Sequence, residues 1–202
     1  MNKKIGIMGG TFNPIHIGHL LAASSALETF ELDEVMFIPN NIPPHRRNEE
    51  FLVSGELRYQ MVSLAIESNP QFSVSREEID RKEVSFTSDT VTRLKEKMPD
   101  VDFTFITGMD SLMKNKWYKL DNLLEMLERF VAVTRPGFSP GEFEAARKEL
   151  CLENDNKISM MEMPAVGVSS TMIRERIRSG KSVRYMIPEK VESFILEHHL
   201  YK

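Results

Sequence analysis

The stretch KIGIMGGTFNPIHIGHL, residues 4–20, decides how the chain begins to fold. The apolar run Lys4–Met8 has the length of a strand and ends in paired glycines, which interrupt regular structure. From about Gly18, apolar residues follow helical spacing as far as Phe30. The stretch therefore predicts a strand, a loop and a helix, in that order.

The loop of this stretch carries groups that suit a polyphosphate. Gly9 and Gly10 let the backbone approach a phosphate closely, and the next helix begins with free amides at the positive end of its dipole. His16 and His19 add side-chain donors. The glycines match neither the G-x-G-x-x-G dinucleotide fingerprint nor a Walker loop, which excludes both classes. A tight turn with solvated histidines, or a metal site on two histidines, would be simpler interpretations.

Strands and helices alternate along the rest of the chain. Strands are predicted at 35–39, 72–75, 102–107, 130–134 and 158–163, and helices from about 54, then at 87–98, 120–128, 140–152, 170–179 and 188–198. This order is typical of an α/β, Rossmann-like, doubly wound fold, a mostly parallel sheet with helices on both faces. No repeat or linker-like tract interrupts it, so residues 1–202 are predicted to form a single domain.

Composition excludes several classes of function. Lys and Arg total 26 against 30 Asp and Glu, so the basic excess of a general nucleic-acid binder is missing. The sequence has a single cysteine, Cys151, and no apolar run approaches the roughly 18 residues of a membrane helix. We therefore expect a cytoplasmic protein that binds neither nucleic acid nor membrane. The sequence leaves assembly into a homo-oligomer open.

Two segments far apart resemble the paired signatures of the nucleotidyltransferase superfamily. GGTFNPIHIGHL, residues 9–20, is similar to G-x-F-x-P-x-H-x-G-H, which holds ATP in that superfamily, and VSSTMIRERI, residues 168–177, is similar to its second signature. The residue types of the second segment suit a phosphate ligand. A helix that starts with hydroxyl side chains offers free amides to phosphates, and an arginine one turn later adds a positively charged guanidinium group. Alone, VSSTMIRERI would indicate only an N-capped surface helix. HIGH at 16–19 also resembles class I aminoacyl-tRNA synthetases, which are longer and have a lysine-rich second signature.

Three further stretches narrow the resemblance. PNNIPPHRR (39–47), SFTSDT (85–90) and GMDSLMKNKWYKLDNLL (108–124) resemble the bacterial nicotinate-nucleotide adenylyltransferases, and the similarity covers almost the whole chain. It implies transfer of the adenylyl group of ATP, accompanied by Mg²⁺, to nicotinate mononucleotide. The products would be nicotinate adenine dinucleotide and pyrophosphate. No covalent enzyme intermediate and no dedicated metal site on the protein would be needed.

The resemblance also implies the site residues. The catalytic residues would be His16, His19 and Arg174. ATP would be bound by these three and by Gly9, Gly10, Thr11, Phe12, Asp110, Ser169, Ser170 and Thr171. The acceptor would be bound by Thr87, Trp117, Tyr118 and Arg46. Thr87 and the backbone after Trp117 would face the nicotinate carboxylate, and the Trp117 ring would face the pyridine. The chain has Asn13 where many members have Asp, and Arg46 where family members often have Lys.

Two kinds of alternative remain at this stage. The acceptor could be nicotinamide mononucleotide or phosphopantetheine, although phosphopantetheine enzymes usually have Thr or Ser in place of His16. The chain could instead be a nucleotide-binding regulator without activity, but both histidines and Arg174 are retained.

Overall fold

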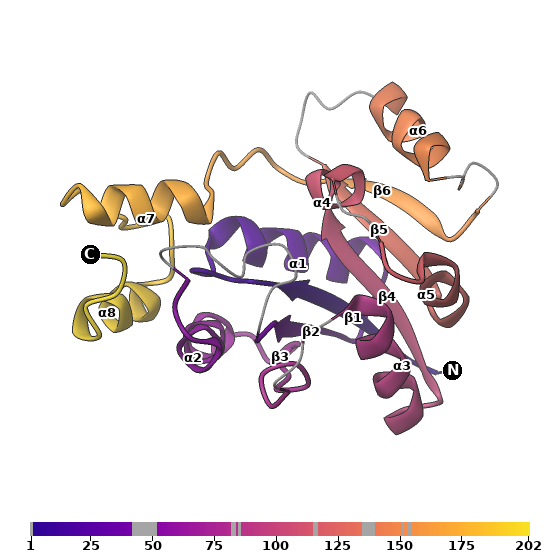
Figure 1. The fold of residues 1–202 in the computed structure, drawn as a ribbon, viewed down its shortest axis with the longest axis horizontal. Helices are drawn as coiled ribbons and strands as arrows, with labels where there is room; N and C mark the ends of the chain where they lie inside the picture. Colours follow the sequence, from indigo (N-terminus) through magenta and orange to yellow (C-terminus); the bar gives the residue numbers. More distant parts are fainter. Residues whose placement is uncertain are drawn as a thin grey trace. The chain divides into compact units, whose positions relative to one another are not determined.

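A computed structural model describes residues 2–41, 52–81, 84, 86–114, 117–134, 140–150, 152 and 155–202, without the side chains of residues 110, 113, 114 and 140. Its strands form a six-stranded sheet in the order β3-β2-β1-β4-β5-β6. The strands are β1 (Lys3–Gly10), β2 (Glu34–Pro39), β3 (Phe72–Val74), β4 (Val101–Gly108), β5 (Arg129–Thr134) and β6 (Ile158–Glu162). This is the strand order of a doubly wound nucleotide-binding fold, so the predicted fold class is confirmed (Figure 1).

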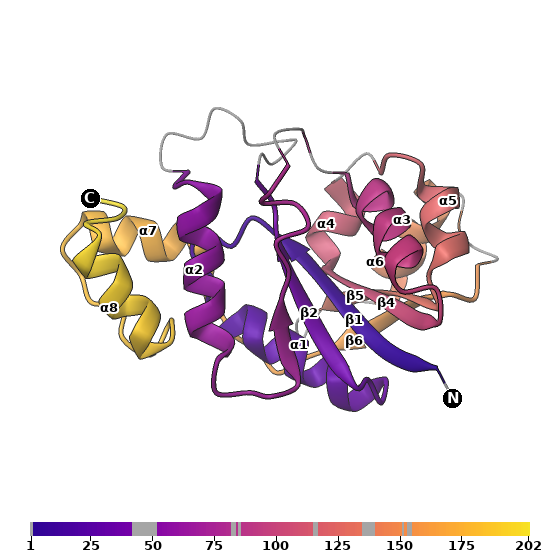
Figure 2. The same ribbon diagram turned by 90° about the horizontal axis from the view of Figure 1, so that it is seen from below.

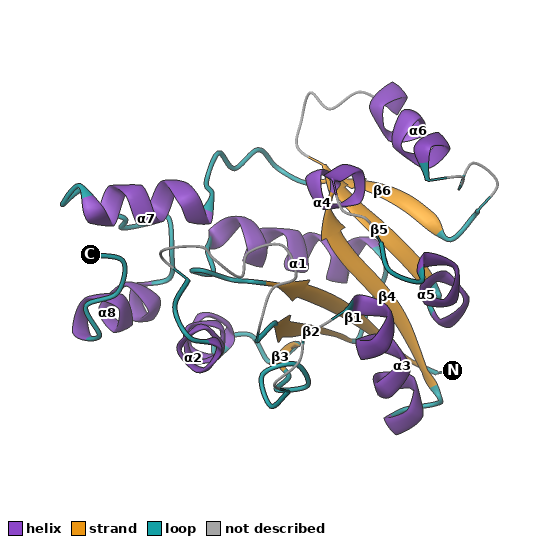
Figure 3. Ribbon diagram, viewed as in Figure 1, coloured by secondary structure: helices purple, strands orange, loops and turns teal. Residues whose placement is uncertain are grey.

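Helices alternate with these strands as the sequence predicts (Figure 3). They are α1 (Ile17–Thr29), α2 (Gly55–Ile66), α3 (Thr87–Lys97), α4 (Met109–Lys114), α5 (Leu120–Met126), α6 (Pro140–Glu149), α7 (Ser170–Arg178) and α8 (Glu189–Glu197). Predicted and observed bounds differ by a few residues at element ends. Helix α4 was not predicted, because it is short and follows β4 directly without a polar loop. Within the described ranges, no helix has the length and apolarity to cross a membrane.

The chain forms two compact units, whose boundaries fall within β1, α1 and β2. Unit 1 comprises residues 1–8, 22–35 and 86–165, and unit 2 comprises residues 9–21, 36–85 and 166–202. The expectation of a single domain stays a prediction.

Unit 1 contains most of the parallel sheet. β1 pairs with β4 in parallel, with Ile5 opposite Phe103, and β4, β5 and β6 continue in parallel. In Figure 2, α3 and α5 lie on one face of these strands and α1 lies on the other. The interior is filled by apolar side chains that include Ile5, Ile7, Val91, Phe103, Ile106, Leu123, Phe130 and Val131. Burial on both faces explains why the strands read as continuous apolar runs.

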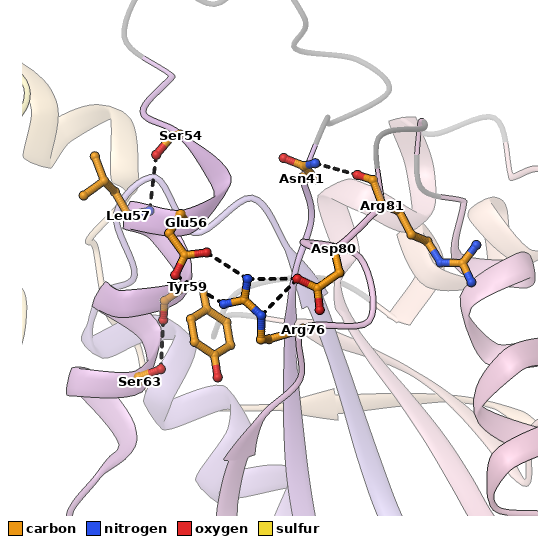
Figure 4. Close-up of polar contacts among 9 residues, drawn as sticks. All are labelled: Asn41, Ser54, Glu56, Leu57, Tyr59, Ser63, Arg76, Asp80 and Arg81. Atoms are coloured by element: carbon orange, nitrogen blue, oxygen red, sulfur yellow. Dashed lines mark hydrogen bonds and ion pairs between the residues drawn. The ribbon is translucent and has the colours of Figure 1, made fainter.

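Unit 2 holds the loop after β1 together with α2, α7 and α8. Helix α2 begins after Ser54, close to the predicted start, and Ser54 Oγ caps it by accepting a hydrogen bond from the Leu57 amide at 3.3 Å. Arg76 joins this helix to the segment after β3 through ion pairs with Glu56 and Asp80 at 2.9 and 2.8 Å, and it lies over the Tyr59 ring (Figure 4). These charges are exposed, so they contribute little to stability.

Candidate functional site

The loop between β1 and α1 is built around the buried ring of Phe12. Phe12 is 3% exposed and has a φ of 48°, a left-handed conformation that is rare for a bulky residue. A Cβ at Gly10 would stand 2.9 Å from this ring, so packing against Phe12 favours glycine at this position. The ring also packs against His19 and Phe37. The Phe12 side chain therefore belongs to the packing of the loop, and the contact of Phe12 with ATP stays a prediction.

The structure brings His16 and His19 together. Their imidazole rings stack with centroids 3.7 Å apart, and a Cβ at Gly18 would stand 3.1 Å from the His16 ring. The His16 amide donates to Nδ1 of His19 at 3.2 Å. Because Nδ1 accepts, the proton of a neutral His19 sits on Nε2, which can donate to a ligand. Burial, and secondarily the neighbouring His16, hold the pKa of His19 well below its usual range.

This lowered pKa predicts a pH-dependent stability. Below about pH 6.5 the unfolded chain protonates His19 while the folded chain does not, so the free energy of unfolding should fall as the pH drops from there towards the folded pKa. One such group contributes up to about 1.4 kcal/mol per pH unit in that window. Urea unfolding at pH 7.5 and 5.5 measures the effect. His19→Gln should have a smaller pH dependence; equal dependence in both proteins would contradict the assignment.

Helix α7 is anchored to this loop within unit 2. Ser169 caps the helix by accepting from the Met172 amide at 3.2 Å, and Ser170 Oγ donates to the Pro14 carbonyl at 2.8 Å. Both hydroxyls therefore take part in the fold, and their contact with ATP stays a prediction. Thr171 is exposed, and the first-turn amides of α7 have no acceptor within the helix. Apart from the Met172 amide, which donates to Ser169, these amides and the Thr171 hydroxyl are the donors that α7 can offer to an anion.

Arg174 is 6% exposed and is tied to the same loop. Its Nη1 donates to the Asn13 carbonyl at 2.9 Å, and its Nη2 donates to Thr171 Oγ1 at 3.4 Å. The guanidinium thus places a positive charge beside the loop while it fixes the loop backbone. Its contact with ATP stays a prediction.

Unit 1 brings together two of the predicted acceptor residues. Thr87 is the first residue of α3, directly after Phe86, whose ring lies 4.6 Å from that of Tyr118. Asp89 in the first turn of α3 pairs with Lys119 at 3.7 Å. The start of α3 and the segment around Tyr118 therefore lie side by side. The free amides of this helix start could bind a carboxylate.

Trp117 is half-buried in unit 1. Its ring meets those of Phe105 and Phe130 edge-on, with centroids 5.9 and 5.2 Å away. Its Nε1 is buried and has no acceptor among the described residues. The indole is therefore held firmly by the core, as a stacking surface for a ligand ring should be.

Some predictions fall outside the described part of the chain. Arg46 lies there, as does the side chain of Asp110, whose backbone is in α4. Within the described residues, no three His, Cys, Asp or Glu side chains form a group that could hold a metal.

Sequence reasoning missed three residues that organise the loop. Asn13 was noted only as a replacement for Asp, yet Tyr201 donates to its Oδ1 at 2.8 Å. Arg58 is fully buried and donates to the Thr11 carbonyl at 2.6 Å. The sequence does indicate that Arg58 is buried, because it lies at helical spacing from the buried residues Met61, Val62 and Ala65 of α2. A charged residue within an apolar stripe needs polar partners.

Comparisons with known proteins agree with this geometry. Residues 7–176 match the cytidylyltransferase-like family. The chain is 43% identical over 201 residues to a probable nicotinate-nucleotide adenylyltransferase of Moorella thermoacetica, covering 98% of this chain and 92% of that protein. It is 44% identical over 201 residues to the nicotinate-nucleotide adenylyltransferase of Bacillus subtilis, covering 99% of each. Its fold resembles Plasmodium falciparum nicotinic acid mononucleotide adenylyltransferase complexed with NaAD, with a TM-score of 0.77, 21% identity and coverage of 98% and 97%.

Proposed function

Since the chain belongs to the cytidylyltransferase-like family and, within it, to the nicotinate-nucleotide adenylyltransferases, we propose that it transfers the adenylyl group of ATP to nicotinate mononucleotide. The products are nicotinate adenine dinucleotide and pyrophosphate, a step of NAD biosynthesis. The observation that carries this proposal is the stacked pair of His16 and His19 beside the loop and α7. Unit 2 therefore holds the uncharged donors of the loop and α7 together with the positive charge of Arg174, as the binding of a polyphosphate requires.

The reaction is an in-line displacement at the α-phosphorus of ATP. An oxygen of the acceptor phosphate forms the new bond, and the bond from the α-phosphorus to the pyrophosphate oxygen breaks. Because the acceptor phosphate is already ionised near neutral pH, no general base is needed. Catalysis then comes from positioning and from donors aimed at the charge that develops on the phosphates.

Each group in unit 2 has a part in that scheme. Nδ1 of His19 accepts a hydrogen bond from the His16 amide, so the ring donates to an ATP phosphate from Nε2. The amides at the start of α7 bind the phosphates that leave, and Arg174 supplies positive charge nearby. ATP would enter as its Mg²⁺ complex, and the metal would neutralise part of the charge on the phosphates.

The acceptor is recognised in unit 1. The amides at the start of α3, around Thr87, bind the nicotinate carboxylate, and the Trp117 ring packs against the pyridine. Tyr118 lies beside this helix start through its contact with Phe86. Asp110 and Arg46 keep their predicted parts in binding the nucleotide sugar and the acceptor. A cytoplasmic location also remains a prediction from the sequence.

Pyrophosphate release tests the proposal. Purified protein, ATP and Mg²⁺ should release pyrophosphate when nicotinate mononucleotide is added, and much more slowly with nicotinamide mononucleotide or phosphopantetheine. Release with phosphopantetheine alone would assign a different acceptor. No release with any acceptor would favour a regulator that binds nucleotide without reacting.

A further inference from the structure

The loop at residues 11–14 is held in a conformation that it would not adopt by itself. Phe12 is left-handed with a φ of 48°, and the neighbouring Asn13 is 1% exposed. Such a conformation persists only where surrounding contacts over-determine it. The loop is also buried, so its carbonyl groups need donors. Arg58 donates to one of these carbonyl groups, and Tyr201 donates to the side-chain amide oxygen of Asn13; neither residue has a part in the proposed chemistry.

Arg58 reaches the loop from α2. Its Nη1 donates to the Thr11 carbonyl at 2.6 Å and to Asn40 Oδ1 at 3.2 Å, its Nη2 to the Asn41 carbonyl at 2.8 Å, and its Nε to the Val53 carbonyl at 3.0 Å. One rigid, planar group therefore ties the loop after β1 to the segment after β2. Burial lowers the pKa of Arg58 to about 10, which leaves it charged at neutral pH.

Tyr201 reaches the same loop from the far end of the chain. Its hydroxyl donates to Asn13 Oδ1 at 2.8 Å, across a separation of 188 residues. The side chain is 4% exposed, and its backbone is left-handed with a φ of 63°. Burial raises the pKa of Tyr201, so the hydroxyl stays protonated and keeps donating. Asn13 Oδ1 also accepts from the Val53 amide at 3.4 Å.

We propose that Arg58 and Tyr201 are positioning residues, a loop clamp that holds residues 11–14 in the shape that presents the loop to ATP. Neither residue needs to touch a substrate. The clamp acts on the segment between Gly10 and the stacked pair of His16 and His19, so a small shift of the loop moves both the backbone amides and the histidines. Its effect on catalysis rests on the proposed function, whereas its effect on the loop does not.

Tyr201→Phe tests the clamp by removing one oxygen while keeping the buried ring. Because small displacements of positioned groups are costly, kcat/KM for ATP should fall about tenfold. The KM for nicotinate mononucleotide at saturating ATP should stay unchanged. Tyr185→Phe is the matched control, because Tyr185 is 81% exposed and should leave both parameters unaltered. A Tyr201→Phe protein whose kcat/KM for ATP stays within twofold of the unmodified value would overturn the proposal, even if its Tm falls.

Hydrogen exchange gives a readout that does not depend on activity. In the nucleotide-free protein, the His16 amide donates to His19 and the Ile17 amide donates to the Met186 carbonyl. In Tyr201→Phe, a peptide spanning residues 11–17 should exchange at least about tenfold faster, because local opening becomes easier. Unchanged exchange would overturn the clamp. If the variant exchanges faster but the unmodified protein releases no pyrophosphate, the clamp is supported and the proposed function is rejected.

Arg58→Lys adds a second variant, because it keeps the charge but loses the planar fork. If it folds, we expect a loss of kcat/KM for ATP at least as large as in Tyr201→Phe, with the same selectivity for ATP over the acceptor. A folded Arg58→Lys protein with normal ATP kinetics would remove Arg58 from the clamp.

Discussion

Replacing His19 with alanine is expected to lower kcat for dinucleotide formation by about 10²–10³-fold, the usual cost of losing one positioned donor to transition-state charge. The reason lies in the tautomer. Nδ1 of His19 accepts from the His16 amide, which leaves the ring proton on Nε2, and the lowered pKa keeps the ring neutral. A neutral donor acts mainly where charge develops, so kcat should fall more than KM for ATP rises.

The same loss of turnover is expected for His16→Ala, accompanied by a lower Tm. His16 is 7% exposed and stacks on His19, so its removal leaves a cavity and frees the second ring to rotate. His198→Ala is the matched control, because His198 is an exposed histidine that stacks on Phe194 at the end of α8. Steady-state kinetics on His19→Ala, His16→Ala and His198→Ala distinguish the loss of a phosphate donor from the general effect of removing a histidine. Near-normal turnover in His19→Ala would remove the phosphate-site assignment.

The second large effect concerns the choice of the acid over the amide. Nicotinate and nicotinamide mononucleotides differ only in a carboxylate against a carboxamide. Amides at the start of α3 can donate to both carboxylate oxygens, whereas a carboxamide would turn its own NH₂ towards one donor. Each buried group left unpaired costs about 1–3 kcal/mol, and about 1.4 kcal/mol is a factor of ten. The ratio of kcat/KM values should therefore favour the acid at least about tenfold.

Thr87→Pro tests which donor makes this choice. Thr87 is the first residue of α3, and Phe86 before it is extended, with φ −106° and ψ 137°. Proline is well tolerated at that helical position and after an extended residue, so the substitution removes one N–H and leaves the helix intact. The preference for the acid should shrink. Thr87→Ala, which keeps the N–H, should retain it. An unchanged preference in Thr87→Pro would move carboxylate recognition elsewhere.

Trp117→Ala separates ring stacking from carboxylate recognition. The indole is held by Phe105 and Phe130, and it would pack equally against either pyridine ring. Its loss should raise KM for both acceptors by similar factors, without changing the ratio between them. A change in that ratio would contradict the division of labour between Trp117 and the start of α3.

Much of the fold could be predicted because local signals agreed with the final structure. β1 ends at the second of the two glycines after Met8, Ser54 caps α2, and Gly180 closes α7 with a φ of 66°. In each case the deciding residue lies within a few positions of the feature that it determines. Helix α4 was missed because its six residues give too little periodicity to recognise.

The loop contacts could not be predicted, because they join residues far apart in sequence. Periodicity places Tyr201 after a terminal helix, but nothing local indicates that its hydroxyl meets Asn13. Nothing local indicates either that the Ser170 hydroxyl donates to the Pro14 carbonyl. A hydroxyl at a helix start can serve a ligand or the fold, and only tertiary structure distinguishes the two.

The fate of the α-phosphate of ATP tests the central claim most directly. ATP labelled at that position, nicotinate mononucleotide and Mg²⁺ are incubated with the protein, and the products are separated and identified by mass. We predict that the label appears in nicotinate adenine dinucleotide, with one unlabelled pyrophosphate released for each dinucleotide formed. Label that stays in ATP, or that ends in AMP or ADP without dinucleotide, would contradict adenylyl transfer to this acceptor.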